Sequence, residues 1–126
     1  MGDFRSDQPI YTQLVEKITL SVLSGKFPPG AKLPAVRELA AQAGVNPNTM
    51  QKAFAELERT GLIYSQRTSG RFVTEDAAVI GFAKERLARQ RMDEFLQSMH
   101  CLGYDNKEVL RLLQSREEEI NVYSDL

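Results

Sequence analysis

The chain has 126 residues, of which 42% are hydrophobic and 26% are charged, and its formal net charge is −1. This composition is typical of a folded domain and argues against disorder, and the length leaves no room for an enzyme domain beside a second module. The sequence has neither an apolar run long enough to span a membrane nor the layout of a signal peptide, so we expect a cytoplasmic protein without a membrane partner.

The first predicted element is a scaffold helix over residues 9–23. Its apolar residues recur at four-residue spacing, which is one face of a helix: Ile10, Leu14, Ile18 and Val22. Gly25 lies where a C-terminal cap would, and the prolines and glycine of 27–30 predict a rigid turn. Lys26 and Lys32 flank this connector, and charges in a connector are more often solvated than bound to a partner.

Residues 33–54 predict two short helices joined by a tight turn. The first helix has apolar residues at helical spacing: Leu33, Val36, Leu39 and Ala40. Gly44 permits the chain reversal, Asn46 is a good N-cap, and Pro47 suits the first position of the second helix. The second helix should bury four residues: Met50, Ala53, Phe54 and Leu57. This arrangement is typical of a helix-turn-helix.

The second helix opens with polar residues of which none is acidic: Asn46, Asn48, Thr49, Gln51 and Lys52. Amides pair with adenine edges, hydroxyl groups and lysine hold phosphates, and a helix N-terminus attracts anions. We therefore expect these residues to contact DNA in the major groove. Arg37, near the start of the first helix, should contact a phosphate. The alternative is an ordinary helical hairpin in which Asn and Thr only cap.

A basic hairpin follows the second helix. Gly61 ends the helix, residues 62–64 are prone to form a strand, and residues 66–71 form a basic turn before the extended segment 72–74. Two strands around a basic loop predict the wing of a winged helix-turn-helix, whose arginines reach a minor groove. The expected wing contacts are Arg67, Gly70 and Arg71. The fold class is α+β, mainly α.

These motifs identify a family resemblance. The segments PIYTQLVEKI, GKFPPGAKLP, VRELA and VNPNTMQKAF, between Pro9 and Val73, resemble the DNA-binding domain of the GntR family of bacterial transcription regulators. With its short helical tail the chain is most similar to the YtrA subfamily. The resemblance implies a repressor that occupies a promoter, a two-helix dimerisation tail, and a DNA contact at Arg37.

Two departures from the family pattern affect the expected contacts. Ala35 stands where many relatives have Ser, which removes a capping box to Glu38 and a hydroxyl contact to phosphate. The wing, residues 67–73, lacks one glycine and one lysine of the family's usual Arg-Gly-Lys-Gly-Thr-Phe-Val and has Arg71 in addition.

The tail, residues 76–126, predicts two helices. The first, capped by Thr74 or Asp76 and running to about residue 102, carries a narrow apolar seam: Ala88, Met92, Phe95, Met99 and Leu102. At about 27 residues it would be roughly 40 Å long, more than a small domain can cover, so we expect this seam to form a homodimer interface. Folding of the tail onto the winged domain is the alternative.

The second tail helix should be capped by Asp105 or Asn106 and carry an apolar side: Val109, Leu110, Leu113 and Ile120. Charge also divides the chain. Residues 1–75 hold nine basic against seven acidic side chains, a net of +2, whereas residues 76–126 hold seven against ten, a net of −3. We therefore predict a DNA-binding domain over 1–75 and a dimerisation region over 76–126, since phosphate contacts depend on local clusters of cations.

The chain offers little catalytic chemistry. His100 and Cys101 are its single histidine and cysteine, so we expect no metal, no cofactor and no enzyme activity. The predicted function is a sequence-specific transcription regulator, a repressor by resemblance, that binds a palindromic double-stranded operator as a homodimer. A small-molecule effector at the junction of the two regions is a further candidate partner. The alternative is a winged-helix module for protein interaction, which should have an acidic or apolar recognition face.

Overall fold

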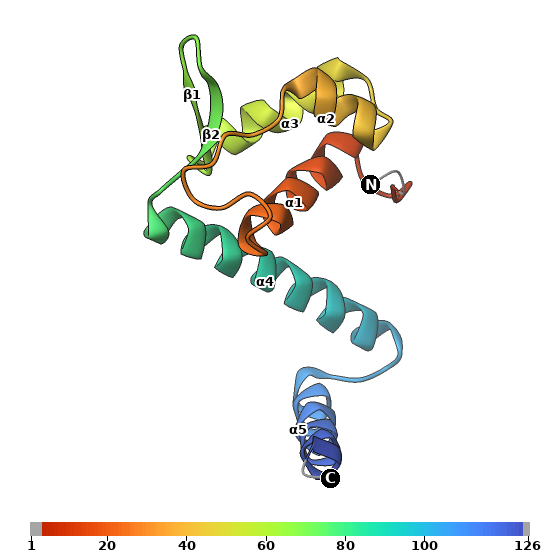
Figure 1. Cartoon of the computed structure of the whole chain (residues 1–126). Coiled ribbons are helices and arrows are strands. Elements are labelled where there is room, and N and C mark those ends of the chain that lie inside the picture. Colours follow the sequence, from red (N-terminus) through yellow and green to blue (C-terminus); the bar gives the residue numbers. More distant parts are fainter. Residues whose placement is uncertain (1–3, 125–126) are drawn as a thin grey trace. The chain divides into compact units, whose positions relative to one another are not determined.

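Five helices and one two-stranded sheet form the part of the chain that the computed structural model describes, residues 4–124, with side chains described up to Asn121 (Figure 1). In chain order they are α1 (Ile10–Leu23), α2 (Val36–Ala43), α3 (Pro47–Arg59), β1 (Ile63–Gln66), β2 (Gly70–Val73), α4 (Ala77–Cys101) and α5 (Asn106–Ser124). The predicted α+β, mainly helical class is confirmed.

The chain divides into two units, Met1–Glu85 and Arg86–Leu126, with the boundary inside α4. We expected the division between residues 75 and 76, at the end of the wing. The first turns of α4 belong with the winged unit because Ile80 and Ala83 pack against its hydrophobic core. No helix among the described residues is long and apolar enough to cross a membrane.

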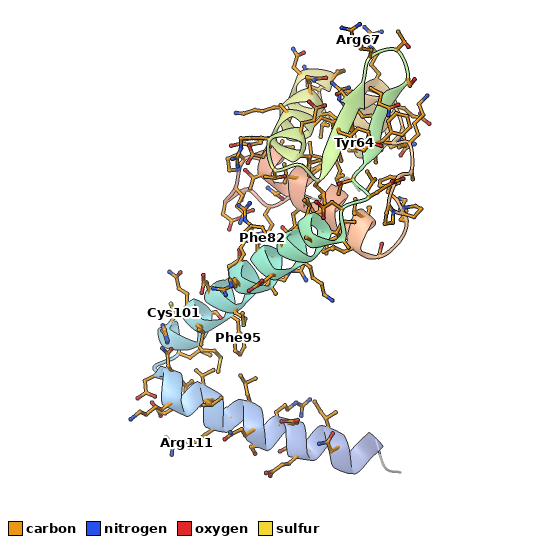
Figure 2. The ribbon with its side chains drawn as sticks, turned by 90° about the vertical axis from the view of Figure 1, so that its left-hand side faces the viewer. Tyr64, Arg67, Phe82, Phe95, Cys101 and Arg111 are labelled. Atoms are coloured by element: carbon orange, nitrogen blue, oxygen red, sulfur yellow. The ribbon has the colours of Figure 1, made fainter. Side chains whose placement is uncertain are left out.

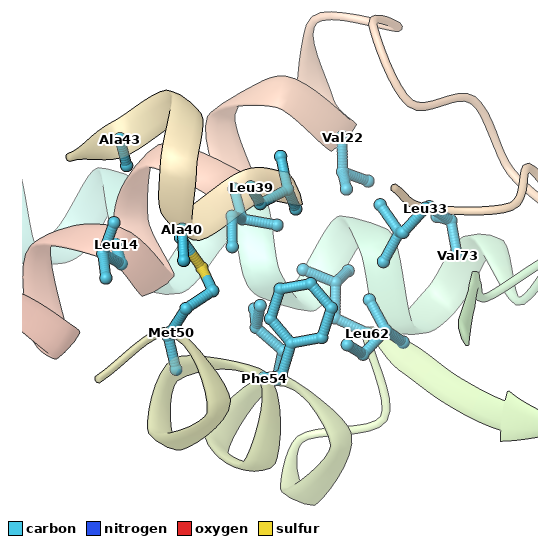
Figure 3. Close-up of a cluster of buried hydrophobic side chains, with 14 residues drawn as sticks. Leu14, Val22, Leu33, Leu39, Ala40, Ala43, Met50, Phe54, Leu62 and Val73 are labelled. Carbon is cyan, nitrogen blue, oxygen red and sulfur yellow. The ribbon is translucent and has the colours of Figure 1, made fainter. Parts of the chain in front are cut away.

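The core of the first unit is built from α1, α2, α3 and the base of the wing (Figure 3). Its buried side chains are Leu14, Ile18, Val22, Leu33, Leu39, Ala40, Ala43, Met50, Ala53, Phe54, Leu57, Leu62, Ile63 and Val73. The predicted buried face of α3 is confirmed. Ile10 was expected in this core and is 44% exposed. Residues four apart drift by about 40° around a helix, so the start of a long four-residue repeat leaves the buried face.

The turn between α2 and α3 confirms the predicted roles of Gly44 and Asn46. Gly44 has φ 69°, a left-handed conformation that suits glycine, and its N–H donates to the carbonyl of Ala41 at 3.2 Å. The Asn46 side-chain oxygen accepts the N–H of Asn48 at 2.8 Å, and Pro47 begins α3. Ala35 caps α2 without a side-chain hydrogen bond, as its sequence predicts.

The wing pairs β1 with β2 in antiparallel register from Ile63 opposite Val73 to Gln66 opposite Gly70. The connector before α2 joins this sheet, which the sequence did not predict. The N–H of Leu33 donates to the carbonyl of Arg71 at 2.8 Å, and the N–H of Val73 donates to the carbonyl of Ala31 at 2.9 Å. Three connector residues are too few to show the alternating pattern of a strand.

Both tail helices are capped by side chains. Asp76 accepts the N–H of Ala78 at 2.9 Å, and Thr74 in turn accepts the N–H of Asp76 at 3.1 Å, so both predicted caps take part. Asp105 accepts the N–H of Glu108 at 2.8 Å, and the Glu108 carboxylate accepts the N–H of Asp105 at 3.1 Å. This reciprocal pair is a capping box, which makes Asp105 the cap of α5.

The N-cap of α3 provides a stability test. We predict that Asn46→Ala lowers the free energy of unfolding by about 1 kcal/mol, because the N–H of Asn48 loses its side-chain acceptor. The measurement is urea unfolding followed by circular dichroism. Asn48→Ala is the matched control at the same helix end and should change stability by less than about 0.5 kcal/mol. Equal losses in the two variants would contradict the capping role.

Candidate nucleic-acid interface

The N-terminal part of α3 exposes the polar face that the sequence predicts. Asn46, Asn48, Gln51 and Lys52 are exposed and Thr49 is half-buried, while the opposite face of the helix lies in the core. The Asn46 oxygen is engaged as the cap, which leaves its amide nitrogen as a donor for other partners. Burial of one face of α3 thus directs its amides toward solvent.

Lys52 is held at the junction of α3 and α1. Its ammonium nitrogen lies 4.0 Å from the centroid of the Tyr11 ring, a cation–π contact. The sequence did not single out Tyr11, because the two residues come together only when α1 packs against α3. The contact fixes the position of one cation beside the polar face.

Two of the three remaining cations that we expected to contact DNA are exposed, at different places in the winged unit. Arg37 is exposed in the first turn of α2. Arg67 is exposed in the turn between β1 and β2, and Figure 2 shows it at the tip of the wing. Both side chains are accessible to a large partner.

Arg71 lies elsewhere than expected. It is half-buried in β2, its Nε donates to Glu58 of α3 at 2.6 Å, and its guanidinium carbon lies 5.4 Å from the centroid of the Phe54 ring. The basic turn of residues 66–71 had led us to expect Arg71 among the wing contacts. Alternation along a strand turns it inward, toward α3, so the structure does not bring it to the wing tip with Arg67.

Glu58 is the acidic partner in this contact. The Ser65 hydroxyl donates to the same carboxylate oxygen at 2.7 Å. The hydrogen bond from Ser65, and next the one from Arg71, hold the pKa of Glu58 below its ordinary value of 4.5. The carboxylate is therefore ionised at neutral pH and balances the charge of Arg71.

Lys32 is a cation that sequence reasoning left as solvated. Its backbone pairs with that of Phe72 of β2 in an antiparallel β-bridge. Its side chain lies against Gly70, where an added Cβ would be 3.0 Å from Lys32 Cε. Gly70 itself has φ 104°, which disfavours other residues. Lys32 thus lies beside the wing because the connector that carries it pairs with β2, and this pairing is seen only in the structure.

The predicted dimer seam lies in the second unit and is largely uncovered. Ala88, Met92, Phe95 and Leu102 are exposed, Leu102 by 71%, and Met99 is half-buried. Part of the seam also faces α5. Phe95, which Figure 2 labels on α4, and Met99 line a groove of about 400 Å³ whose other lining residues come from α5: Val109, Leu112, Leu113, Ser115, Arg116 and Glu119.

Comparison with known proteins identifies the winged unit. Residues 10–73 match the model of the bacterial regulatory proteins of the gntR family. This chain belongs to the gntR family. The HTH-type transcriptional repressor YtrA of Bacillus subtilis is 36% identical over 104 residues, which cover 82% of this chain and 80% of YtrA. The chain is thus a DNA-binding transcription regulator, and its family is regulatory rather than enzymatic.

Solved structures extend the likeness. A GntR family transcriptional regulator from Listeria monocytogenes superposes with a TM-score of 0.77 at 37% identity, over 89% of this chain and 98% of that one. The AraR DNA-binding domain in complex with operator ORR3 is similar over 59% of this chain and 92% of its own, with a TM-score of 0.51 and 37% identity. The predicted family, with its YtrA-like members, is confirmed.

The position of Lys32 can be tested by salt titration. We predict that Lys32→Ala weakens binding to all duplexes alike and lowers the slope of log K against log salt by about one, since one phosphate loses its cation. The measurement is fluorescence anisotropy at several salt concentrations. Lys26→Ala removes the same charge from a lysine that lies 5.6 Å from the Phe27 ring, and should leave the slope unchanged. A slope that changes equally in both variants would remove this role from Lys32.

Proposed function

We propose that this gntR-family regulator is a homodimeric repressor that recognises a palindromic operator in double-stranded DNA. The observation that carries the proposal is the acid-free polar face of residues 46–52, which includes the packed Lys52, together with an exposed arginine at the wing tip. An acidic or apolar recognition face, which a protein-interaction module should have, is absent from these described residues.

The proposed contacts divide by chemistry. Asn48 and Gln51 read base edges in the major groove, because side-chain amides pair with adenine. Asn46 contributes its free amide nitrogen. Phosphate contacts come from hydroxyl and cationic groups, which position the protein without reading sequence: Lys32, Arg37, Thr49 and Lys52. At the wing, Arg67 enters a minor groove and Gly70 lets the backbone approach, whereas Arg71 supports the wing from behind.

The second unit supports the homodimer. Exposed apolar side chains lie on both helices and in the turn between them, among them Met92, Phe95, Leu102, Leu110 and Leu113. Contiguous exposed apolar surface typically marks a protein interface. A two-fold dimer formed through the seam would present two α3 helices to half-sites about 34 Å apart, one turn of DNA, which is why we propose a palindromic operator.

Repression and location follow from the same comparison. YtrA is a repressor by name and matches most of the length of this chain, so we propose that binding occludes a promoter. Bacterial chromosomal DNA lies in the cytoplasm, which is where such a regulator acts. An effector at the junction of the two regions stays a prediction.

Selection from random DNA is the decisive test of this function. The wild-type protein should enrich a palindromic sequence, protect both half-sites in a footprint, and bind with the stoichiometry of one dimer per site. Enrichment of no sequence would overturn specific recognition and favour the protein-interaction module. Enrichment of an asymmetric site by a monomer would overturn the symmetric dimer.

Base reading by α3 makes a sharper prediction. Asn48→Ala should cost roughly 1 to 3 kcal/mol at the selected operator and leave binding to scrambled DNA unchanged, because the amide pairs with a base edge. Parallel anisotropy titrations on the two duplexes measure this difference. Asn46→Ala offers no clean control because Asn46 also caps the helix, so Ala55→Ser, at an exposed position further along α3, serves instead. Equal losses on both duplexes would contradict base reading.

The seam also predicts the oligomeric state. Leu102→Glu should dissociate the dimer, because an ionised carboxylate on a buried apolar interface has no partner there. Sedimentation velocity reports the change. Gln97→Glu adds the same charge at an exposed position of α4 outside the seam and should remain dimeric. Phe95→Glu combined with Met99→Glu should act more strongly, with circular dichroism checking that α4 and α5 persist. A Leu102→Glu protein that stays dimeric would refute the seam.

A further inference from the structure

Glu58, near the end of α3, contacts both strands of the wing through one carboxylate oxygen. Oε1 accepts the Ser65 hydroxyl of β1 at 2.7 Å and the Arg71 Nε of β2 at 2.6 Å. Ser65 and Arg71 are partners in the strand register, so their side chains lie on the same face of the wing. A single acidic group therefore ties α3 to both strands.

Arg71 also packs against a core residue of α3. The guanidinium of Arg71 lies 5.4 Å from the centroid of the Phe54 ring, and Phe54 is fully buried in the middle of α3. A planar guanidinium over an aromatic ring gains from both stacking and charge. Arg71 is thus held by two residues of α3 that lie one turn apart, and its position relative to this helix is well defined.

Other charged residues lie close to Glu58 on the same elements. Glu56 forms its ion pair with Arg59, three residues further along α3. Arg67 is exposed at the wing tip. Glu56 carries the same charge as Glu58 and lies on the same helix, whereas the contacts of Glu58 to Ser65 and Arg71 link α3 to the wing.

We propose that Glu58 is a positioning residue for sequence-specific DNA binding, which fixes the wing against α3 so that the wing tip and the polar face engage one site together. The inference rests on the proposed function. Groups held in their bound geometry lose less conformational entropy on binding. Non-specific binding, which depends on phosphate charge, needs no such fixed geometry. Loosening the wing should therefore weaken binding to the selected site more than it weakens non-specific binding.

The experiment compares Glu58→Gln with Glu56→Gln, which makes the same charge change on the same helix. Each is titrated against a duplex carrying the site that the wild-type protein selects and against a scrambled duplex of equal length. For Glu58→Gln the specificity ratio should fall roughly tenfold, equivalent to a coupling of about 1.4 kcal/mol. Binding to scrambled DNA should stay equal or become tighter, since a negative charge is lost. Glu56→Gln should keep the wild-type ratio.

Several outcomes would overturn the inference. Equal losses on both duplexes with a lower melting temperature would make Glu58 a purely structural residue, and equal gains on both would make it a simple repulsive charge. Ser65→Ala is the variant to use if Glu58→Gln does not fold. It removes one of the two wing contacts of Glu58 and keeps the charge, so the specificity ratio should fall by less than tenfold. If the wild-type protein selects a site and the variants keep its specificity ratio, this inference alone is contradicted. If the wild-type protein selects no site, the proposed function is contradicted.

The pair should also behave as a unit. If Glu58 acts by holding Arg71, the double variant Glu58→Gln with Arg71→Gln should lose no more specificity than the more affected single variant. Additive losses would show that the two side chains act separately and would contradict the positioning role.

Discussion

Burial of the inner face of α3 is the constraint on which the rest of the structure depends. Met50, Ala53, Phe54 and Leu57 are essentially inaccessible to solvent and pack among α1, α2 and the base of the wing. Removing side chains of this size from water contributes about 1.5 to 3 kcal/mol each for the larger ones. Because a helix has 3.6 residues per turn, this burial also directs the amide-bearing face of residues 46–52 outward.

The same core sets the wing. Leu62, Ile63 and Val73 anchor the base of the hairpin in the cluster that contains Phe54, and Arg71 rests over the Phe54 ring while it binds Glu58. Helix α3 and the wing therefore share one hydrophobic core. Because the shared core already holds both elements in place, less conformational entropy is lost when they bind DNA.

The second unit differs from the first in how little of its apolar surface is buried. The caps at Asp76 and Asp105 start two helices that keep much of their apolar surface exposed, and Phe95 and Met99 meet α5 across a groove. A helix pair with this much exposed apolar area is stabilised most simply by a second copy, which would also supply the symmetry that an operator dimer needs. The structural feature that supports dimerisation is thus the surface left uncovered.

The sequence by itself determined the elements and the local signals: helix spacing, the left-handed Gly44, the Asn46 cap and the basic hairpin. These depend on residues within a few positions of one another, so periodicity and capping chemistry suffice to read them. Only the tertiary structure decided that Lys52 lies over Tyr11, that Lys32 joins the wing, and that Arg71 turns toward Glu58. Such pairs join different elements and leave no periodic mark, because they exist only once the shared core has brought those elements together.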